Sequence, residues 1–263
     1  MASGSCGMRI LRLFPIMPLL LGVNIDHIAT LRQARYAADL SSPNAEPCPV
    51  QAGHDAVAGG ADSLTIHIRG DRRHMQDADA FQIRSELTVP LNLEMAVTEE
   101  MLGIALRLKP EFVCLVPENR QEITTEGGLD VLGSLRKIHD VVARLRDAGI
   151  RVSVFIDPEF RQVDAAIEVG ADMIELHTGA FANATGVAEK MELDRLTVAA
   201  THAHPSLQVN AGHGINFTNI SQILTIPYLA ELNIGHSIIA RATRVGLTVA
   251  VREMKEAMTH YLA

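Results

Sequence analysis

The chain has 263 residues and a formal net charge of -8, and nearly half of its residues are hydrophobic. This acidic balance excludes a general nucleic-acid surface, because phosphate backbones are bound by clusters of Lys and Arg. The three cysteines have no CxxC spacing, which indicates neither a disulfide framework nor a zinc site and favours a reduced, cytoplasmic location. No apolar stretch reaches the ~20 residues that a membrane span needs.

The first residues, 1–18, are predicted to be a disordered extension, or to precede an alternative start at Met8 or Met17. They do not fit a signal peptide, because Pro15 and Pro18 interrupt the apolar stretch and no small-residue cleavage site follows it. The remainder, 19–263, contains no linker rich in Pro, Gly or Ser and is therefore predicted to be one catalytic domain.

Eight short apolar runs, each ending in polar residues, predict eight buried strands. They lie near residues 20–26, 63–69, 90–96, 112–117, 151–157, 173–178, 207–211 and 231–235. The segments between them have helical periodicity: one begins at Thr98 and ends before Pro110, and another begins near Leu135 and ends before Gly149. This alternation predicts a (β/α)8 TIM barrel with short extra helices, and a doubly wound sheet is the alternative.

Polar side chains at the strand ends are the candidate reactive groups. In a parallel barrel all strands end on one face, so these residues are expected to meet at one mouth. Glu94 and His213 are the strongest candidates, because a carboxylate held near imidazoles acquires a shifted proton affinity that proton-transfer enzymes use. Structural alternatives exist: Asn24 and Asp26 could cap strand ends, and His177 could hold a neighbouring loop.

Glycine turns and basic clusters predict two anion sites. Gly212-His213-Gly214 and Gly235-His236-Ser237 follow the last two strands, where barrels often bind phosphate at a helix N-terminus. A second, cationic group follows the first two strands and contains Arg32, Arg35, Arg69, Arg72, Arg73 and His74. Two separated anion sites indicate two phosphorylated substrates or one bisphosphate.

Several chemistries are disfavoured. The four lysines all fall in predicted helices or at their ends, so a Schiff-base lysine is missing from the strand ends. The sequence contains no GxSxG, HExxH or Walker motif. His67, His74, Glu94 and His213 form no recognisable metal-ligand motif, and we expect no metal; metal-assisted catalysis is the alternative.

These strand ends resemble the pyridoxine 5'-phosphate synthase family, over about residues 20–258. The resemblance lies in the stretches GVNIDHIATLR from Gly22, HIRGDRRH from His67, NLEMAVT from Asn92, VPE from Val116 with TTEGGLD from Thr124, VNAGHG from Val209 and ELNIGH from Glu231. It implies a barrel enzyme that joins 1-deoxy-D-xylulose 5-phosphate to 3-amino-2-oxopropyl phosphate and releases inorganic phosphate and water, without metal or organic cofactor. The substrate supplies the amine, which agrees with the missing lysine.

The resemblance also implies roles for individual residues. His67 and Glu94 would accept protons, His213 would donate one, and Glu175 would support the transition state. The amino-ketone phosphate would be bound by Asn24, Arg35, Gly214, Gly235 and His236, and the deoxyxylulose phosphate by Asp26, His27, Arg69, His74 and Thr124. The loop from Glu118 to Gly128 would close over the mouth. The family assembles as an octamer built from dimers.

Two other functions stay open from the sequence. A metal-assisted aldolase or isomerase would need a divalent ion in the pocket. A catalytically silent barrel would bind phosphorylated metabolites or a partner and form no product.

Overall fold

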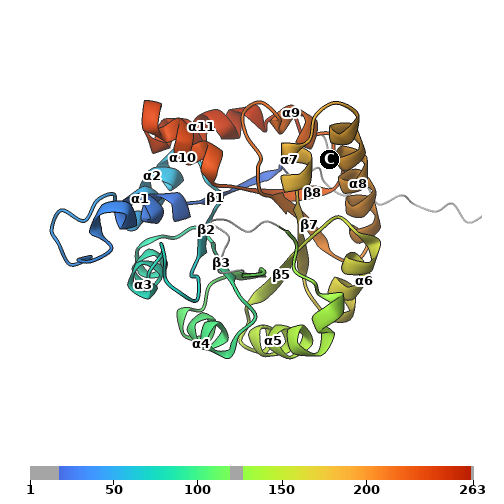
Figure 1. Ribbon diagram of the computed structural model, residues 1–263, viewed down its shortest axis with the longest axis horizontal. Helices are drawn as coiled ribbons and strands as arrows, with labels where there is room; N and C mark the ends of the chain where they lie inside the picture. The colour runs from blue at the N-terminus through green and yellow to red at the C-terminus, as the bar shows by residue number, and fades with distance from the viewer. Residues whose placement is uncertain (1–17, 119–126, 262–263) are drawn as a thin grey trace, which may run out of the picture.

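The computed structural model describes residues 18–118 and 127–261, which form a closed barrel of eight parallel strands surrounded by helices (Figure 1). The strands are β1 (Leu20–Asn24), β2 (Ser63–His67), β3 (Leu91–Met95), β4 (Phe112–Leu115), β5 (Arg151–Ile156), β6 (Met173–His177), β7 (Gln208–Gly212) and β8 (Leu229–Ile234). Because β1 pairs with both β2 and β8, the sheet is closed. The predicted (β/α)8 barrel is confirmed, and the doubly wound alternative is wrong.

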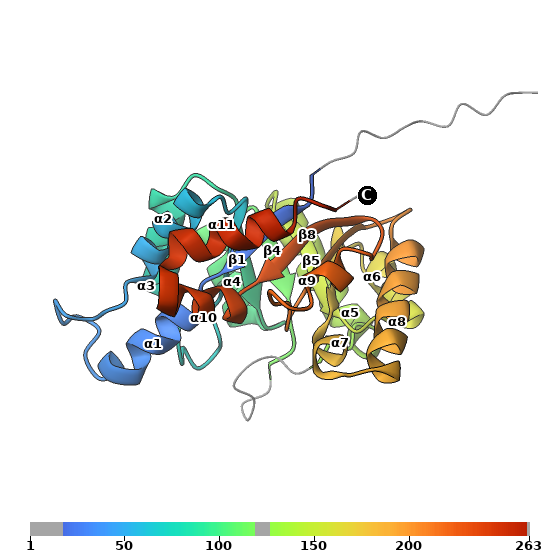
Figure 2. The same ribbon diagram turned by 90° about the horizontal axis from the view of Figure 1, so that it is seen from above.

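Helices cover the outside of this barrel. They are α1 (Asp26–Tyr36), α2 (Pro49–Gly59), α3 (Asp77–Glu86), α4 (Glu99–Leu108), α5 (Leu135–Asp147), α6 (Phe160–Glu168), α7 (Gly179–Asn183), α8 (Val187–Ala203), α9 (Ile220–Ile223), α10 (His236–Val245) and α11 (Leu247–Ala257), with a 3-10 turn at Leu132–Ser134. The short α7 and α9 are among the extra helices that the sequence predicts. In Figure 2, α7 lies on the side of the barrel opposite the start of β1 and the end of α11.

The strands are buried on both faces, as expected for a parallel sheet wrapped in helices. Side chains such as Ile66, Leu93 and Ile174 have no exposed surface and pack in the main hydrophobic core. Polar residues of β2 and β8, the two strands that flank β1, bond to one another: Thr65 Oγ1 donates to Asn233 Oδ1 at 3.2 Å. Ser63 Oγ likewise donates to Glu231 at 2.7 Å. These bonds reduce the desolvation penalty of polar groups inside the barrel.

The N-terminus of α4 is capped by Thr98, as its sequence predicts. The Thr98 hydroxyl accepts the backbone N–H of Met101 at 3.3 Å, which satisfies one of the free donors of the first turn. Glu99 and Glu100 also place negative charge at this positive end of the helix dipole.

Replacing Thr98 with Ala is expected to lower the free energy of unfolding by about 1 kcal/mol, because the capping acceptor is lost. Urea denaturation followed by far-ultraviolet circular dichroism measures this. Thr201→Ala is the matched control, since the Thr201 hydroxyl donates to a carbonyl within α8 and caps no helix start. Equal stabilities of the two variants would show that the Thr98 cap contributes nothing.

None of the helices among the described residues is long and apolar enough to cross a membrane. The predicted N-terminal extension falls, apart from residue 18, outside the described residues. So do the centre of the predicted closing loop and Thr124 within it.

Candidate active site

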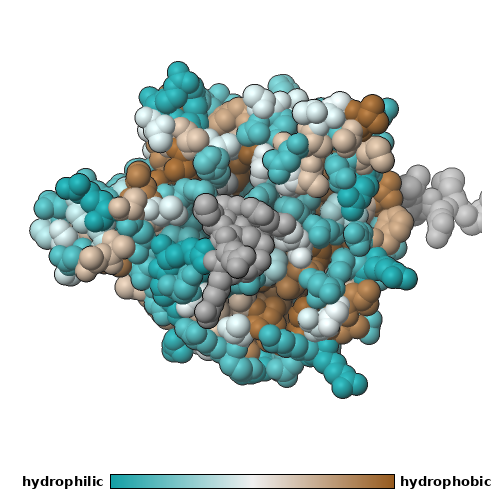
Figure 3. Space-filling model, viewed as in Figure 1, coloured by the Kyte–Doolittle hydropathy of each residue, from teal (hydrophilic) through white to brown (hydrophobic). Residues whose placement is uncertain are grey.

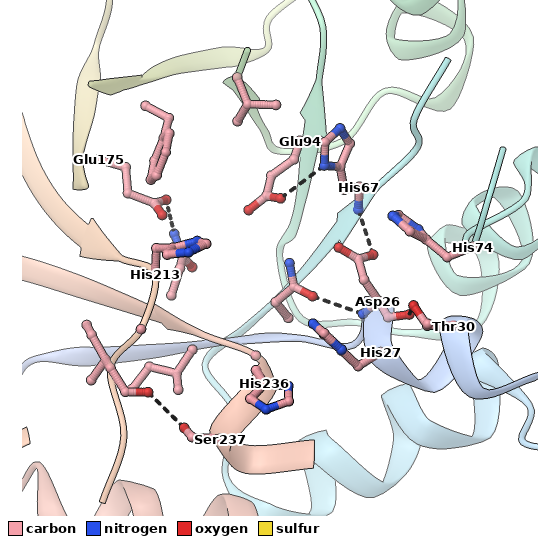
Figure 4. Close-up of a pocket in the computed structure, with 18 of the residues that line it drawn as sticks. Asp26, His27, Thr30, His67, His74, Glu94, Glu175, His213, His236 and Ser237 are labelled. Atoms are coloured by element: carbon pink, nitrogen blue, oxygen red, sulfur yellow. Dashed lines mark hydrogen bonds and ion pairs between the residues drawn. The ribbon is translucent and has the colours of Figure 1, made fainter. Parts of the chain in front are cut away.

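A cavity of about 600 Å³ opens at the carboxyl ends of the strands. It is lined by twelve of the fourteen site residues that the sequence analysis proposed, namely Asn24, Asp26, His27, His67, Arg69, His74, Glu94, Glu175, His213, Gly214, Gly235 and His236. Segments as distant as β1 and α10 therefore supply side chains to one space (Figure 4). Figure 3 shows the same face of the molecule, on which hydrophilic side chains predominate over α1 and α3.

His67 lies between two carboxylates. Its Nδ1 is 3.6 Å from Oε2 of Glu94, and its Nε2 is 2.9 Å from Oε1 of Glu118. The backbone register makes the first contact possible, because His67 and Glu94 are direct partners on the neighbouring strands β2 and β3. The backbone N–H of His67 also donates to Asp26 at 2.8 Å. The imidazole is therefore held on two sides, and the backbone of His67 is fixed by Asp26.

Glu94 is a carboxyl group that resists ionisation. Burial raises its pKa well above the usual value, and the negative charges of Asp26 and Glu175 raise it further. A hydrogen bond with Asn24 and the charge of Arg69 offset only part of this effect. A carboxyl group with a raised pKa holds its proton more tightly, and its ionised form is a stronger base, so Glu94 is suited to take part in proton transfer.

Glu175 is the second carboxyl group facing the cavity with a shifted pKa. Its pKa is raised to about 7, mainly by burial and also by the charge of Glu231, while a hydrogen bond donated by the Asn233 side chain opposes the shift. Figure 4 shows Glu94 and Glu175 on different strands with their carboxyl groups directed into the same cavity. Two carboxyl groups of raised pKa can therefore take up or release protons at one ligand.

His213 follows β7 in an unusual backbone conformation, with a φ of 79°. Such a positive φ is uncommon for a residue other than glycine, and it clusters at functional sites. The hydroxyl of Thr178 donates to the carbonyls of Gly212 and His213 at 2.8 and 2.5 Å, which stabilises this turn. The pKa of His213 is lowered to about 4, mainly by burial and to a smaller extent by the positive charges that His177 and His27 carry when protonated. The ligand-free protein therefore holds His213 neutral at pH 7.

One predicted anion site lies at the start of α10. Gly235 precedes this helix, and His236 and Ser237 form its first turn, where backbone N–H groups are free to bind an anion. The rings of His27 and His236 meet edge to face at 4.9 Å. Burial lowers the pKa of His27, and the charge of His236 lowers it further.

The predicted cationic cluster is only partly at the cavity. Arg69, Arg73 and His74 line it. Arg32 instead makes a buried two-fold contact with Asp79, at 2.7 Å for both bonds, and Arg72 pairs with Asp77 and Glu100. Their assignment to the anion site is corrected, because these guanidinium groups hold α1 and the segment after β2 against α3 and α4.

Arg35 and Thr124 are the two proposed site residues that the structure does not place in the cavity. Arg35 lies in the last turn of α1, exposed, with its guanidinium 5.7 Å from the ring of Tyr36. Thr124 lies outside the described residues.

The structure adds a functional candidate, Glu118, that the sequence analysis left out of its site residues. Burial opposes ionisation of its carboxyl, but hydrogen bonds from His67 and from the backbone of Gly70, together with the charge of Arg69, lower its pKa. Its signals in the sequence are its position, three residues after the end of β4, and its place in the VPE stretch that carries the resemblance. Its pairing with His67 depends on the path of the segment after β4, which no local pattern encodes.

Among the residues that the structure describes, one group of side chains could hold a metal ion. Asp26, His67 and Glu94 offer ligand atoms that all lie within 4.8 Å of one another. This group differs from the His67, His74, Glu94 and His213 set considered from the sequence. Its two carboxyl groups repel each other's charge, which raises the pKa of Glu94 in the ligand-free protein.

A closed parallel barrel that gathers imidazoles and carboxyl groups of shifted pKa at one cavity defines a (β/α)8-barrel enzyme of the acid/base type. The chain belongs to the family described as pyridoxal phosphate biosynthesis protein PdxJ, whose model matches residues 21–260. The resemblance noted from the sequence is confirmed.

Relatives of known name support the same assignment. The chain is 59% identical over 242 residues to pyridoxine 5'-phosphate synthase of Akkermansia muciniphila, which covers 91% of this chain and 98% of the relative. It is 54% identical over 242 residues to the protein of that name from Synechococcus sp., with the same coverage of both chains. The solved structure of KGPDC from Streptococcus mutans matches with a TM-score of 0.65 and 9% identity, over 94% of this chain and 100% of that chain. At that identity the likeness shows the fold alone.

Proposed function

We propose that this chain is a pyridoxine 5'-phosphate synthase that joins 1-deoxy-D-xylulose 5-phosphate to 3-amino-2-oxopropyl phosphate and closes the pyridine ring by acid/base catalysis. The supporting observation is one cavity that brings together His67, Glu94, Glu175 and His213 beside the start of α10. Proton acceptors, a proton donor and a candidate anion site are then within reach of one pair of substrates.

His67 and Glu94 are assigned as proton acceptors. Glu118 accepts a hydrogen bond from Nε2 of His67, and this leaves the lone pair of Nδ1 on the side of Glu94. The lone pair of Nδ1 can remove a proton from a carbon or nitrogen atom of a bound intermediate, and Glu94, once ionised, is a stronger base than an ordinary carboxylate because its pKa is raised.

His213 is assigned as a proton donor, and Glu175 as the group that supports the transition state. Since the pKa of His213 is about 4 without ligand, the imidazole must gain its proton after substrate binds. Phosphorylated substrates bring negative charge into the cavity, and a nearby negative charge raises the pKa of an imidazole. Binding and activation of the donor are thereby coupled.

Substrate contacts are proposed from the same resemblance. The amino-ketone phosphate is assigned to Asn24, Arg35, Gly214, Gly235 and His236, and the deoxyxylulose phosphate to Asp26, His27, Arg69, His74 and Thr124. Arg35 lies outside the described cavity and Thr124 outside the described residues, so these two assignments depend on the resemblance alone.

No protein amine is assigned to the reaction. Among the described residues that line the cavity there is no lysine. The carbon–nitrogen double bond is therefore proposed to form between the two substrates, with the protein moving protons and binding phosphate groups. An octameric assembly and a cytoplasmic location stay predictions.

Turnover in the presence of EDTA tests this function. Purified protein given both substrates and excess EDTA is expected to form pyridoxine 5'-phosphate and inorganic phosphate. Activity that is lost with EDTA and restored by a divalent ion would favour the metal-assisted alternative, with Asp26, His67 and Glu94 as the ligands. Binding of both substrates without product would favour the silent barrel.

Replacing Glu118 with Gln is expected to lower kcat by roughly 10- to 100-fold with little change in KM. The amide can donate to Nε2 of His67, which moves the imidazole proton to Nδ1 and removes the lone pair facing Glu94. Steady-state kinetics with both substrates measures this. Glu86→Gln is the matched control, since Glu86 contacts the exposed His54 at 3.3 Å away from the cavity. If the two variants had the same kcat, the positioning role of Glu118 would be wrong.

A further inference from the structure

A buried histidine beside His213 has no role in the reaction described so far. His177 ends β6, its side chain is 9% exposed, and its Nδ1 lies 2.9 Å from Oδ1 of Asp157. The hydrogen bond from His177 lowers the pKa of Asp157, so Asp157 is a carboxylate at neutral pH and accepts the proton on Nδ1. The Nε2 of a neutral His177 then carries a lone pair, and it has no hydrogen-bond partner among the described residues.

The unpartnered nitrogen lies on the side of His213. The rings of His177 and His213 make an edge-to-face contact with centroids 5.2 Å apart, and the Phe155 ring packs beside both. Gly179 lies at the same point: a Cβ there would be 2.4 Å from Nε2 of His177 and 3.0 Å from Cδ2 of His213. Any larger residue would fill the space that the two rings share, so this glycine keeps Nε2 of His177 accessible to His213.

We propose that His177 and Asp157 are positioning residues for His213, in which Nε2 of His177 accepts the ring N–H of His213 once that ring is protonated. The inference rests on the proposed role of His213 as a proton donor. In the ligand-free protein the rings touch without a hydrogen bond. Protonation gives His213 a second N–H group, and the lone pair of His177 is a buried acceptor placed to bind it. Asp157 fixes the His177 tautomer, as the carboxylate of a Ser-His-Asp triad does for its histidine.

Other charged groups near His177 and His213 also change the pKa values at this place. Asp157 follows β5, and His213 follows β7. The charge of His27 on α1 lowers the pKa of His213. On the outer side, the charge of Arg195 on α8 lowers the pKa of Asp157. Since burial keeps the free His213 neutral, an acceptor that favours its protonated form increases the fraction of enzyme able to donate a proton during turnover.

The test uses two variants of the full chain, His177→Phe and Asp157→Asn. Phenylalanine keeps the ring volume and removes both ring nitrogens. Loss of the unpartnered Nε2 offsets loss of the Nδ1 bond to Asp157, whose side chain is 44% exposed and can be hydrated, so the unfolding midpoint is expected to change little. We expect kcat to fall about ten-fold or more, with KM for both substrates within about two-fold. The alkaline limb of the kcat profile should move to lower pH, because His213 loses the acceptor for its protonated form. His177→Gln, which retains an acceptor oxygen, should recover part of the activity.

Asp164→Asn is the matched control. Asp164 pairs with the exposed His202 at 2.7 Å, far from the cavity lining, and its loss should change neither kcat nor the pH profile. Wild-type kcat and pH limbs in both test variants, or a loss that only follows a lower unfolding midpoint, would overturn the positioning role. His213→Gln separates this from failure of the proposed function: full activity in that variant would remove His213 from the reaction itself.

Discussion

Replacing Glu94 with Gln is expected to lower kcat by about 10²- to 10⁴-fold, because the glutamine amide cannot accept a proton in the transition state. Affinity for inorganic phosphate should stay close to that of the unchanged protein, since Glu94 lies at the end of β3 and the candidate anion site is at the start of α10. Steady-state kinetics and phosphate titration by calorimetry measure the two effects separately.

The free energy of unfolding of the Glu94→Gln variant gives a second test of whether Glu94 has a catalytic or a structural role. Gln has nearly the same shape and no charge, so it removes a carboxyl whose ionisation is opposed by burial and by Asp26 and Glu175. At pH 8 the free energy of unfolding of the variant should therefore be equal to or higher than that of the unchanged protein. Catalytic residues often lower stability in this way, so replacing them can stabilise the fold. A fall in stability together with lost phosphate binding would show that Glu94 is structural.

Glu231→Gln is the matched control for this variant. Glu231 is also a buried carboxyl of the barrel, and burial raises its pKa too, but its side chain accepts a hydrogen bond from Ser63 and does not line the main cavity. Its replacement reaches the site only through the small effect of its charge on the pKa of Glu175, so kcat should stay within a few-fold of the original value. A collapse of activity in both variants would indicate a general effect of altering the barrel interior.

The sequence predicted the strands and the meeting of their ends, for a physical reason. Each strand is an apolar run followed at once by polar residues, and closure of a parallel barrel places all of these ends on one face. Knowing the fold is then enough to bring His67, Glu94 and His213 to one cavity, because their places in the strands determine their height in the barrel.

The parts that could not be predicted depend on long side chains and on connecting segments. Arg32 and Arg72 follow the first two strands as an anion-binding residue would, yet they reach Asp79 and Asp77. The Arg32 pair joins positions 47 residues apart in the chain. A long guanidinium side chain can reach several acceptors from one backbone position by changing its rotamer, so no local pattern specifies which acceptor it binds.

The raised pKa of Glu175 makes the free energy of unfolding depend on pH, and the sign of this dependence follows from the direction of the pKa shift. Burial raises its pKa from the usual 4.5 to about 7 in the folded state. A carboxyl with a raised pKa contributes stability below its unfolded value, and this contribution is lost as the pH rises through the folded value. The difference corresponds to about 3 kcal/mol of unfolding free energy, lost between about pH 4.5 and pH 8.

Glu175→Gln should remove this dependence. The variant is expected to match the unchanged protein near pH 4 and to exceed its free energy of unfolding by about 3 kcal/mol at pH 8, because Gln needs no ionisation where the unfolded glutamate is charged. Urea denaturation at a series of pH values measures the difference. Exposed Glu256→Gln is the control and should follow the unchanged protein at every pH. If Glu175→Gln also followed it, the Glu175 carboxyl would ionise in the folded protein as readily as in the unfolded chain, and its assignment as a proton-active group in the cavity would lose its electrostatic basis.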